Sequence, residues 1–227
     1  MGEGYWENTS QAKYTHVERL GDGRTPLVEI ADKKPTLMTE NIVKDFIGKS
    51  VSMPAGWARS EQNLGGHRSI TTFTAPDGSA TVSLFDRGMN LRSQSAKSFA
   101  DLLAANTALQ GPKVLMPQEI RALADVMGVS NVGDNQYVNS RSYPDPQAPS
   151  FHLSSAQLLP VNGKVVLEVE GNFVDERGKP QKQYRGIFAD AGADGSHVRE
   201  LFLQADDLVG FGKNKKIYSD AVKSIQW

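Results

Sequence analysis

Two strand-like runs in the second half of the chain give the strongest structural signal. Residues 153–161 and 164–174 are joined by Asn162-Gly163, a dipeptide that accepts the positive φ angles of a tight hairpin. In the second run, apolar residues alternate with Glu168 and Glu170, so the apolar side chains share one face of the strand. The pattern predicts a hairpin with one packed face and one face that is at least partly in water.

Further runs of strand character extend this hairpin. A turn at 175–178 leads into residues 181–189, which have the residue types of a strand. A second turn at 190–195 leads into residues 198–203. We therefore expect a meander of four antiparallel strands from 153 to 203.

A separate hairpin is predicted nearer the N-terminus. Residues 69–74 and 79–85 flank Ala75-Pro76-Asp77-Gly78, which is a typical turn sequence. Residues 46–53 also have strand character, and Pro54-Ala55-Gly56 ends that run.

Three segments carry apolar residues at helical spacing. They are a helix that Ser93 or Ser95 caps and that reaches Leu109, a second helix over residues 117–128, and a closing helix over 217–225. Because the helices are separated from consecutive hairpins, the order argues against βαβ units and a parallel sheet. The predicted fold class is α+β: an antiparallel sheet, made of a hairpin and a four-strand meander, flanked by two or three helices.

The length of 227 residues suits one domain with an appended segment. Residues 1–40 are polar, with one strand-like run from Leu27 to Ala31, and contain too few apolar residues for an independent core. We expect 1–40 to form an extension with one or two strands and 41–227 to form a single α+β domain. A partly ordered tail is the alternative interpretation of the first forty residues.

Four segments, spread over about residues 45–227, together have a pattern found in a known family. They are the strand end Ser52–Trp57, the hairpin strand Val82–Phe85, the helical segment Ser98–Leu103 and the closing segment Ala221–Ile225. In these segments the chain resembles the PsbP-like fold superfamily, which includes bacterial DcrB-type proteins and effector-associated chaperones of type VI secretion. The resemblance implies an antiparallel sheet flanked by helices and a protein that binds other proteins. It supplies no catalytic residue.

Composition changes the functional picture mainly through what is missing. The chain has no cysteine, which removes disulfides, thiolate nucleophiles, cysteine zinc sites and iron–sulfur clusters. Lys and Arg total 25 against 26 Asp and Glu, so the net charge of -1 provides no field that would hold nucleic acid or an anionic bilayer. No run approaches the ~18 consecutive apolar residues of a spanning helix. We expect a periplasmic or otherwise extracytoplasmic protein, with a signal or anchor removed upstream, and a cytoplasmic location is the alternative.

The four histidines are the first candidates for chemistry. They are His16, His67, His152 and His197, and no two of them have the spacing of metal ligands. We interpret each one as a surface or hydrogen-bonded residue. His152 directly follows a proline-rich loop at 144–149, so it is the histidine that we consider first for a functional role.

Two glycine-containing segments partly match binding motifs. Residues 190–195 have the spacing of a calcium loop, but Gly192 and Leu201 stand where oxygen ligands are needed, so we predict an Asp-Gly turn. Residues 210–216 place glycines before lysines without the spacing of a phosphate-binding loop. We expect a loop there with solvated lysines, which an acidic partner could contact. No cofactor and no metal is predicted.

The preferred hypothesis is a non-enzymatic protein-binding or accessory protein of the bacterial cell envelope or of a secretion system. A face or edge of the sheet would receive a segment of another protein, and no nucleic acid is expected as a partner. The residues expected at this surface are Glu168, Glu170, Tyr184, Arg185 and His152.

Two alternatives stay open. A hydrolase would assemble its site from dispersed groups such as His152, Asp145 and Glu168, and would need a pocket that brings a histidine and a carboxylate within hydrogen-bond reach. A carrier of a small apolar ligand would need a buried cavity of roughly several hundred cubic ångströms.

Overall fold

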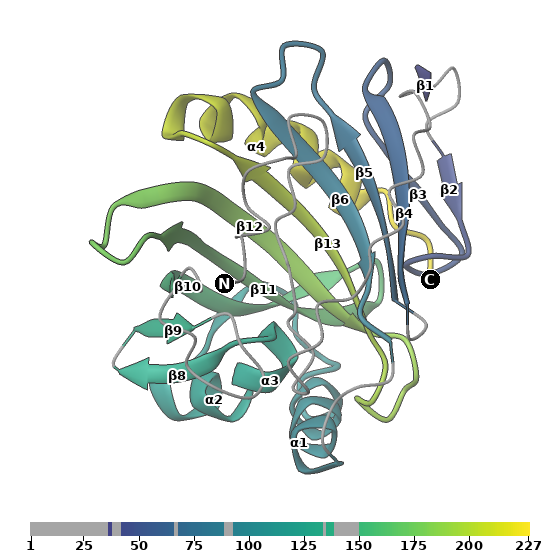
Figure 1. The fold of residues 1–227 in the computed structure, drawn as a ribbon. Coiled ribbons are helices and arrows are strands. Elements are labelled where there is room, and N and C mark those ends of the chain that lie inside the picture. The colour runs from purple at the N-terminus through teal and green to yellow at the C-terminus, as the bar shows by residue number, and fades with distance from the viewer. Residues whose placement is uncertain (1–35, 38–41, 66–67, 89–92, 134, 139–149) are drawn as a thin grey trace.

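One antiparallel sheet organises the described part of the chain (Figure 1). The computed structural model describes residues 36–37, 42–65, 68–88, 93–133, 135–138 and 150–227. All strand pairs within these residues are antiparallel, which confirms the predicted α+β class with an antiparallel sheet. Across the sheet the strands follow in the order β1 (Thr36–Leu37), β4 (Ala58–Gly65), β5 (Arg68–Thr74), β6 (Ala80–Asp86), β13 (Val198–Ala205), β12 (Pro180–Asp190), β11 (Lys164–Val174), β10 (Ser150–Val161), β9 (Gln136–Val138) and β8 (Ser130–Gly133).

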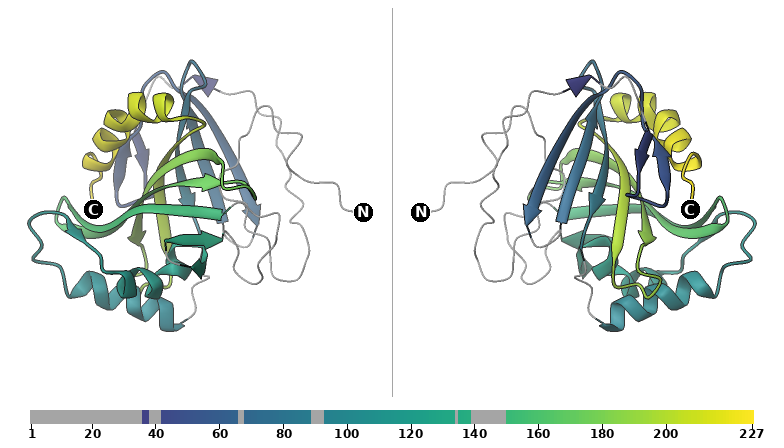
Figure 2. Two further views of the ribbon diagram at one scale, coloured as in Figure 1. Left: turned by 90° about the vertical axis from the view of Figure 1, so that its left-hand side faces the viewer. Right: turned by 90° about the vertical axis from the view of Figure 1, so that its right-hand side faces the viewer.

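Helices cover opposite faces of this sheet (Figures 1 and 2). On one face, which we call the α4 face, α4 (Leu208–Lys223) shares a core with the small ribbon of β2 (Ile42–Lys44) and β3 (Ser50–Ser52). On the other, the α1–α3 face, lie α1, α2 and α3, and the short β7 pairs with β10. Their bounds are Ser93–Ala104 for α1, Pro117–Ala122 for α2, Ala124–Met127 for α3 and Lys113–Val114 for β7. None of the described helices is long and apolar enough to cross a membrane.

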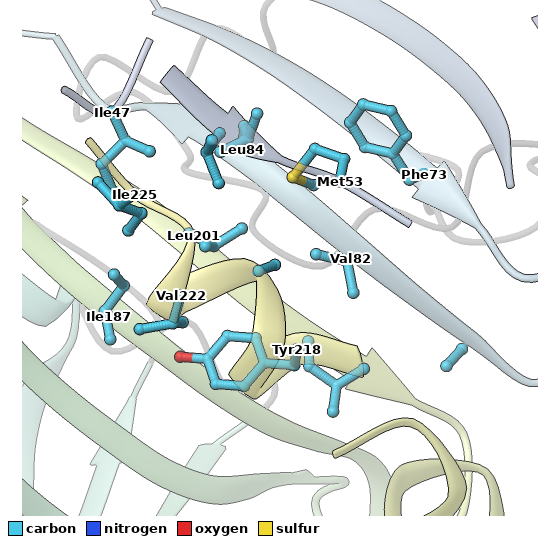
Figure 3. Close-up of a cluster of buried hydrophobic side chains, with 14 of the residues drawn as sticks. Ile47, Met53, Phe73, Val82, Leu84, Ile187, Leu201, Tyr218, Val222 and Ile225 are labelled. Carbon is cyan, nitrogen blue, oxygen red and sulfur yellow. The ribbon is translucent and has the colours of Figure 1, made fainter. Parts of the chain in front are cut away.

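The central strand β13 is buried on both faces. Leu201 faces α4 and Phe202 faces the opposite core, and each is 0% exposed. In the core of the α4 face, Leu201 lies with Val82, Ile187 and Val222, which come from two other strands and from α4 (Figure 3). Burial on both faces explains why Leu201, Phe202 and Leu203 form an uninterrupted apolar run in the middle of β13.

Helix α4 begins earlier than the sequence pattern predicts. The expected loop at 210–216 is helical, so that prediction is wrong. Asp207 caps the helix, because its Oδ1 accepts a hydrogen bond from the Gly210 amide at 2.7 Å. A Cβ on Gly210 would lie 2.5 Å from the carbonyl oxygen of Ser79, so glycine at this position allows the helix to approach the turn between β5 and β6. The burial of Phe211 in the core offsets the low helix propensity of the glycines.

The helix predicted over 117–128 is divided into α2 and α3. Leu123 separates them with φ -102° and ψ 5°, and its side chain is 1% exposed. Leu123 lies in the same core as Ile120 of α2 and Met127 of α3, so both short helices pack on this face of the sheet. Gly128 ends α3 in the left-handed region with φ 70°, as expected for a C-terminal glycine.

The N-terminal extension joins the main sheet at one described point. Thr36 and Leu37 form β1 and pair with Arg59 and Ala58 of β4. The predicted strand-like run at 27–31 lies outside the described residues, and the division at 40 and 41 stays a prediction.

Two glycines, Gly195 and Gly178, allow a test of the close contact between α1 and the turn after β12. Gly195 has φ +77°, and a Cβ there would overlap the carbonyl oxygen of Ala96 in α1. Gly178 has the matching φ of +75° in the turn before β12, with nothing within 4 Å of a built Cβ. We expect Gly178→Ala to lower the free energy of unfolding by about 1 kcal/mol from backbone strain. Gly195→Ala should cost about 2–4 kcal/mol because steric overlap adds to the strain.

Chemical denaturation of both variants measures this difference. Equal losses of stability in the two variants would show that α1 does not depend on close contact with this turn.

Candidate functional site

Two rows of polar side chains cross β10, β11 and β12 on the α4 face, beside α4. Residues that pair across these strands stand next to one another on the same face. The first row is Ser155, Glu170 and Arg185, and the second is His152, Asn172 and Gln183. We call these two rows, together with Lys215 of α4, the polar shelf.

Ion pairs fix the charged part of the shelf. The Arg185 guanidinium binds Glu168 through two bonds, Nε to Oε1 at 3.0 Å and Nη2 to Oε2 at 3.1 Å. Its Nη1 lies 3.6 Å from Glu170 Oε2, and Lys215 Nζ donates to Glu170 Oε1 at 2.7 Å. Partial burial acts to lower the pKa of Arg185, but the hydrogen bond and charge of Glu168 outweigh it and raise this pKa. The guanidinium therefore stays charged and in a fixed orientation.

Glu168 forms the buried base of the shelf. It is 4% exposed, whereas the alternating pattern predicted a solvated side chain. The prediction is wrong because α4 covers this part of β11. Gln157 Nε2 donates to Glu168 Oε2 at 2.6 Å, so the carboxylate is hydrogen-bonded by an amide and neutralised by Arg185.

The residues predicted for a partner surface divide among three places. Glu170, Arg185 and the exposed His152 belong to the polar shelf, and Glu168 lies beneath it. Tyr184 points to the opposite face, is 2% exposed, and its hydroxyl donates to Glu200. The period of two along a strand separates neighbouring residues in this way, so Tyr184 is not part of the shelf.

A buried charged cluster occupies the α1–α3 face. Arg87 Nε donates to Glu200 Oε2 at 2.9 Å, and their side chains are 2% and 0% exposed. Arg87 also donates to the carbonyls of Val126 and Met127 at the end of α3. The cluster thus ties α3 to the central strands.

A small cavity lies beside the buried cluster. Its volume is about 10 Å³, which corresponds to about one water molecule. Its lining is formed by Met127, Val129, Phe151, Val169, Phe173, Tyr184 and Phe188. This cavity is far smaller than the alternative of an apolar-ligand carrier requires.

A histidine–carboxylate pair lies where β6 ends and β13 begins. His197 Nε2 is 2.8 Å from Asp86 Oδ1, and Arg199 Nε is 3.1 Å from Asp86 Oδ2. The Gly88 amide also donates to Asp86 Oδ1. The Asp86 carboxylate therefore accepts hydrogen bonds from three donors. These bonds connect the end of β6 with β13 and with the turn after β6.

The groups named for a hydrolase do not assemble in the described structure. Exposed His152 lies at one end of the polar shelf, whereas Glu168 lies under α4 with Arg185 and Gln157 as partners. Asp145 lies outside the described residues, as do His16 and His67.

In the loop at 190–195, the Asp190 carboxylate accepts hydrogen bonds from backbone amides of the same loop. Asp190 accepts from the amides of Gly192 and Gly195 at 3.0 and 2.9 Å, as in an Asp-Gly turn. Within the described ranges, no three His, Asp or Glu side chains form a group suited to a metal ion. The lysines of 213–216 have acidic neighbours, since Lys213 binds Asp77 and Lys216 binds Asp220.

Removal of the Arg87 side chain tests the buried cluster. Arg87→Ala leaves the Glu200 carboxylate without its guanidinium at a site with 0% exposure, and should lower the free energy of unfolding by about 3–5 kcal/mol. Lys97→Ala, which removes an exposed ion pair with Asp101, should change it by less than about 1 kcal/mol. Adding Glu200→Gln to Arg87→Ala should recover part of the loss in urea denaturation. A double variant no more stable than Arg87→Ala would contradict a charge-based cause.

Two buried tyrosines set the behaviour at high pH. Burial first, then nearby carboxylates, raise the pKa of Tyr184 and of Tyr218 well above the usual 10.0. The unfolded chain releases these protons near pH 10, and the folded chain keeps them, so their contribution to stability is complete below that pH and falls as pH rises above it. In an absorbance titration at about 295 nm, the native protein should show at least two of its six tyrosines ionising only on unfolding. Tyr184→Phe and Tyr218→Phe should each remove one late tyrosine, and full early titration would contradict the assignment.

Comparison with known proteins leaves the geometry as the basis for function. No model of a protein family matches this chain, and a search of curated proteins gives no match either. The resemblance to the PsbP-like fold superfamily therefore stays a hypothesis.

Proposed function

We propose that this chain is a non-enzymatic binding or accessory protein that receives a partner protein on the polar shelf. The observation that carries the proposal is the way the shelf is built. Its side chains stand on three adjacent, hydrogen-bonded strands and one helix, and the buried Glu168 fixes the orientation of Arg185 through two hydrogen bonds. Recognition groups on rigid elements lose little freedom on binding, which favours a specific interface.

The charges indicate which kind of partner fits. Glu170 is already shared by Arg185 and Lys215, whose side chains are 24% and 39% exposed. Two cations and the two carboxylates of Glu168 and Glu170 balance, so the shelf has little net charge. Specificity would therefore come from directional hydrogen bonds, and the partner surface should offer both donors and acceptors, as polar protein surfaces do.

The cellular setting belongs to the same proposal. The absence of cysteine and the resemblance to a family of protein-binding proteins support a place in the bacterial envelope or in a secretion system. Fractionation of the source cells, with the native protein followed by antibody, tests this setting. Recovery with cytoplasmic markers alone would contradict the extracytoplasmic part while leaving the shelf proposal to its own test.

Photo-crosslinking tests the shelf directly. A photoreactive amino acid in place of Gln183 should join one defined partner in native cells, whereas the same group at the exposed Glu176 in the turn after β11 should not. With that partner purified, Asn172→Ala combined with Gln183→Ala should weaken binding about tenfold or more, since each loses a directed hydrogen bond. Both changes leave the ion pairs intact, so the melting temperature should stay nearly constant.

The comparison of position 183 with the control position 176 decides whether the polar shelf is the partner surface. Crosslinks of equal yield from positions 183 and 176, or unchanged affinity of the double variant, would show that the shelf is not the partner surface.

A further inference from the structure

Two exposed apolar side chains lie at the borders of the polar shelf. Among the described residues, the large apolar side chains that are exposed are Ile42, Val114, Met116, Leu208 and Val209. Val114 and Leu208 are 72% and 71% exposed, so both are open to a partner. Single exposed apolar residues are common on protein surfaces, and the positions of these two relative to the shelf decide whether they take part in binding.

Val114 continues the face of the shelf beyond β10. It belongs to β7, which lies next to β10 in the sheet, and it pairs there with Gln157. Gln157 in turn pairs with Glu168 of β11, so the three side chains stand in one row on the α4 face. The next row along these strands is the row of Ser155 and Glu170, which belongs to the shelf. Val114 therefore lies at the border of the shelf beside β10.

Leu208 borders the shelf on the side of α4. Leu208 and Lys215 are seven residues apart in this helix, which is about two turns, so their side chains stand on the same side of it. Lys215 is directed to the shelf, because its Nζ donates to Glu170. Leu208 thus stands on the shelf side of α4, about 10 Å along the helix from Lys215.

The separation of the two apolar residues fits one binding footprint. Val114 is four strand spacings and four residues away from Ala205 of β13, which precedes Leu208 by three residues. Standard spacings of about 4.8 Å between strands and 3.4 Å between residues give a distance of about 24 Å. A standard interface covers about 800 Å² on each partner, which is a patch about 32 Å across. The rows of the shelf span only about 10 Å by 7 Å, so a stable complex has to extend beyond them.

We infer that the occupant of the polar shelf is an extended segment of the partner protein, which places one apolar side chain on Val114 and a second on Leu208. This inference rests on the proposed function of the shelf. Apolar residues six or eight positions apart in an extended segment span about 20–27 Å and, because side chains alternate, point the same way. Between them the free backbone N–H and C=O groups of the segment offer the donors and acceptors that the uncharged side chains of Asn172 and Gln183 can bind.

Selection from a phage-displayed library of random dodecapeptides, with the full chain as the target, tests the inference. Twelve extended residues reach about 40 Å, which is enough to contact both apolar residues. Selected peptides should carry two apolar residues six or eight positions apart. They should bind the variant Val114→Ser/Leu208→Ser about tenfold or more weakly, because apolar surface is no longer buried at either border.

The other exposed apolar residues provide a matched control. Val209 is the neighbour of Leu208 but is turned by about 100° around α4, away from the shelf side. Ile42 lies on β2, in the separate ribbon with β3. The variant Ile42→Ser/Val209→Ser should therefore leave peptide affinity unchanged. All four substituted side chains are at least half exposed, so both double variants should keep nearly the melting temperature of the unchanged chain.

The outcomes separate this inference from the proposed function. Peptides weakened by Asn172→Ala/Gln183→Ala but not by Val114→Ser/Leu208→Ser would overturn the two apolar contacts and leave the shelf as the partner surface. Peptides that depend on neither pair would overturn both proposals. No enriched peptide would overturn an extended segment as the occupant, while the crosslink from position 183 would still test the shelf. A dimer of the chain that Val114→Ser/Leu208→Ser dissociates in sedimentation would identify a second copy as the occupant and would also overturn the inference.

Discussion

The burial of β13 on both faces is the constraint on which the rest of the structure depends. This strand lies between β6 and β12, and its side chains alternate between the core under α4 and the core under α1 to α3. Leu201 and Phe202 are adjacent in the chain and lie in different cores. Each core needs the other, because removing either one would expose apolar side chains of β13, which are Leu201 and Leu203 on one face and Val198 and Phe202 on the other.

Each face also has one buried carboxylate that receives an arginine. Glu200 meets Arg87 on the α1–α3 face, and Glu168 meets Arg185 on the α4 face. A buried carboxylate without a cation would destabilise the fold strongly. The pair of Glu200 and Arg87 therefore requires β13 to lie beside the end of β6, and the pair of Glu168 and Arg185 requires β11 to lie beside β12 in this register. On the α4 face this requirement also orients the polar shelf. The same ion pair therefore serves the packing of β11 and β12 and the presentation of Arg185 to solvent.

The sequence pattern predicted the elements that are specified by residues close together in the chain. Asn162 and Gly163 adopt φ angles of 45° and 90° between β10 and β11, as their turn chemistry requires. Strand β4 was missed, because its sequence from Ala58 to Gly65 is largely polar and it acquires strand structure only by pairing with β5. The start of α4 was missed for a related reason, since the contact of Gly210 with the turn before β6 is not local in sequence.

The candidate sites required information that a strand pattern does not contain. Alternation placed Glu168 and Glu170 correctly on one face, but the depth at which each lies depends on where α4 crosses. The sequence does predict that Tyr184 and Arg185 face opposite sides of the sheet, because they are neighbours in a strand.

The register of β12 depends on contacts that its side chains make on both faces of the sheet. Its adjacent residues Tyr184 and Arg185 reach opposite faces, where the first bonds Glu200 and the second bonds Glu168. A slip of β12 by one residue would turn the guanidinium into the aromatic core around Phe202 and the phenol toward α4. Glu168 would then lose its arginine, and Glu200 would lose the hydrogen bond from the Tyr184 hydroxyl. The register of β12 is thus held from both faces, which gives the polar shelf the fixed geometry that selective binding needs.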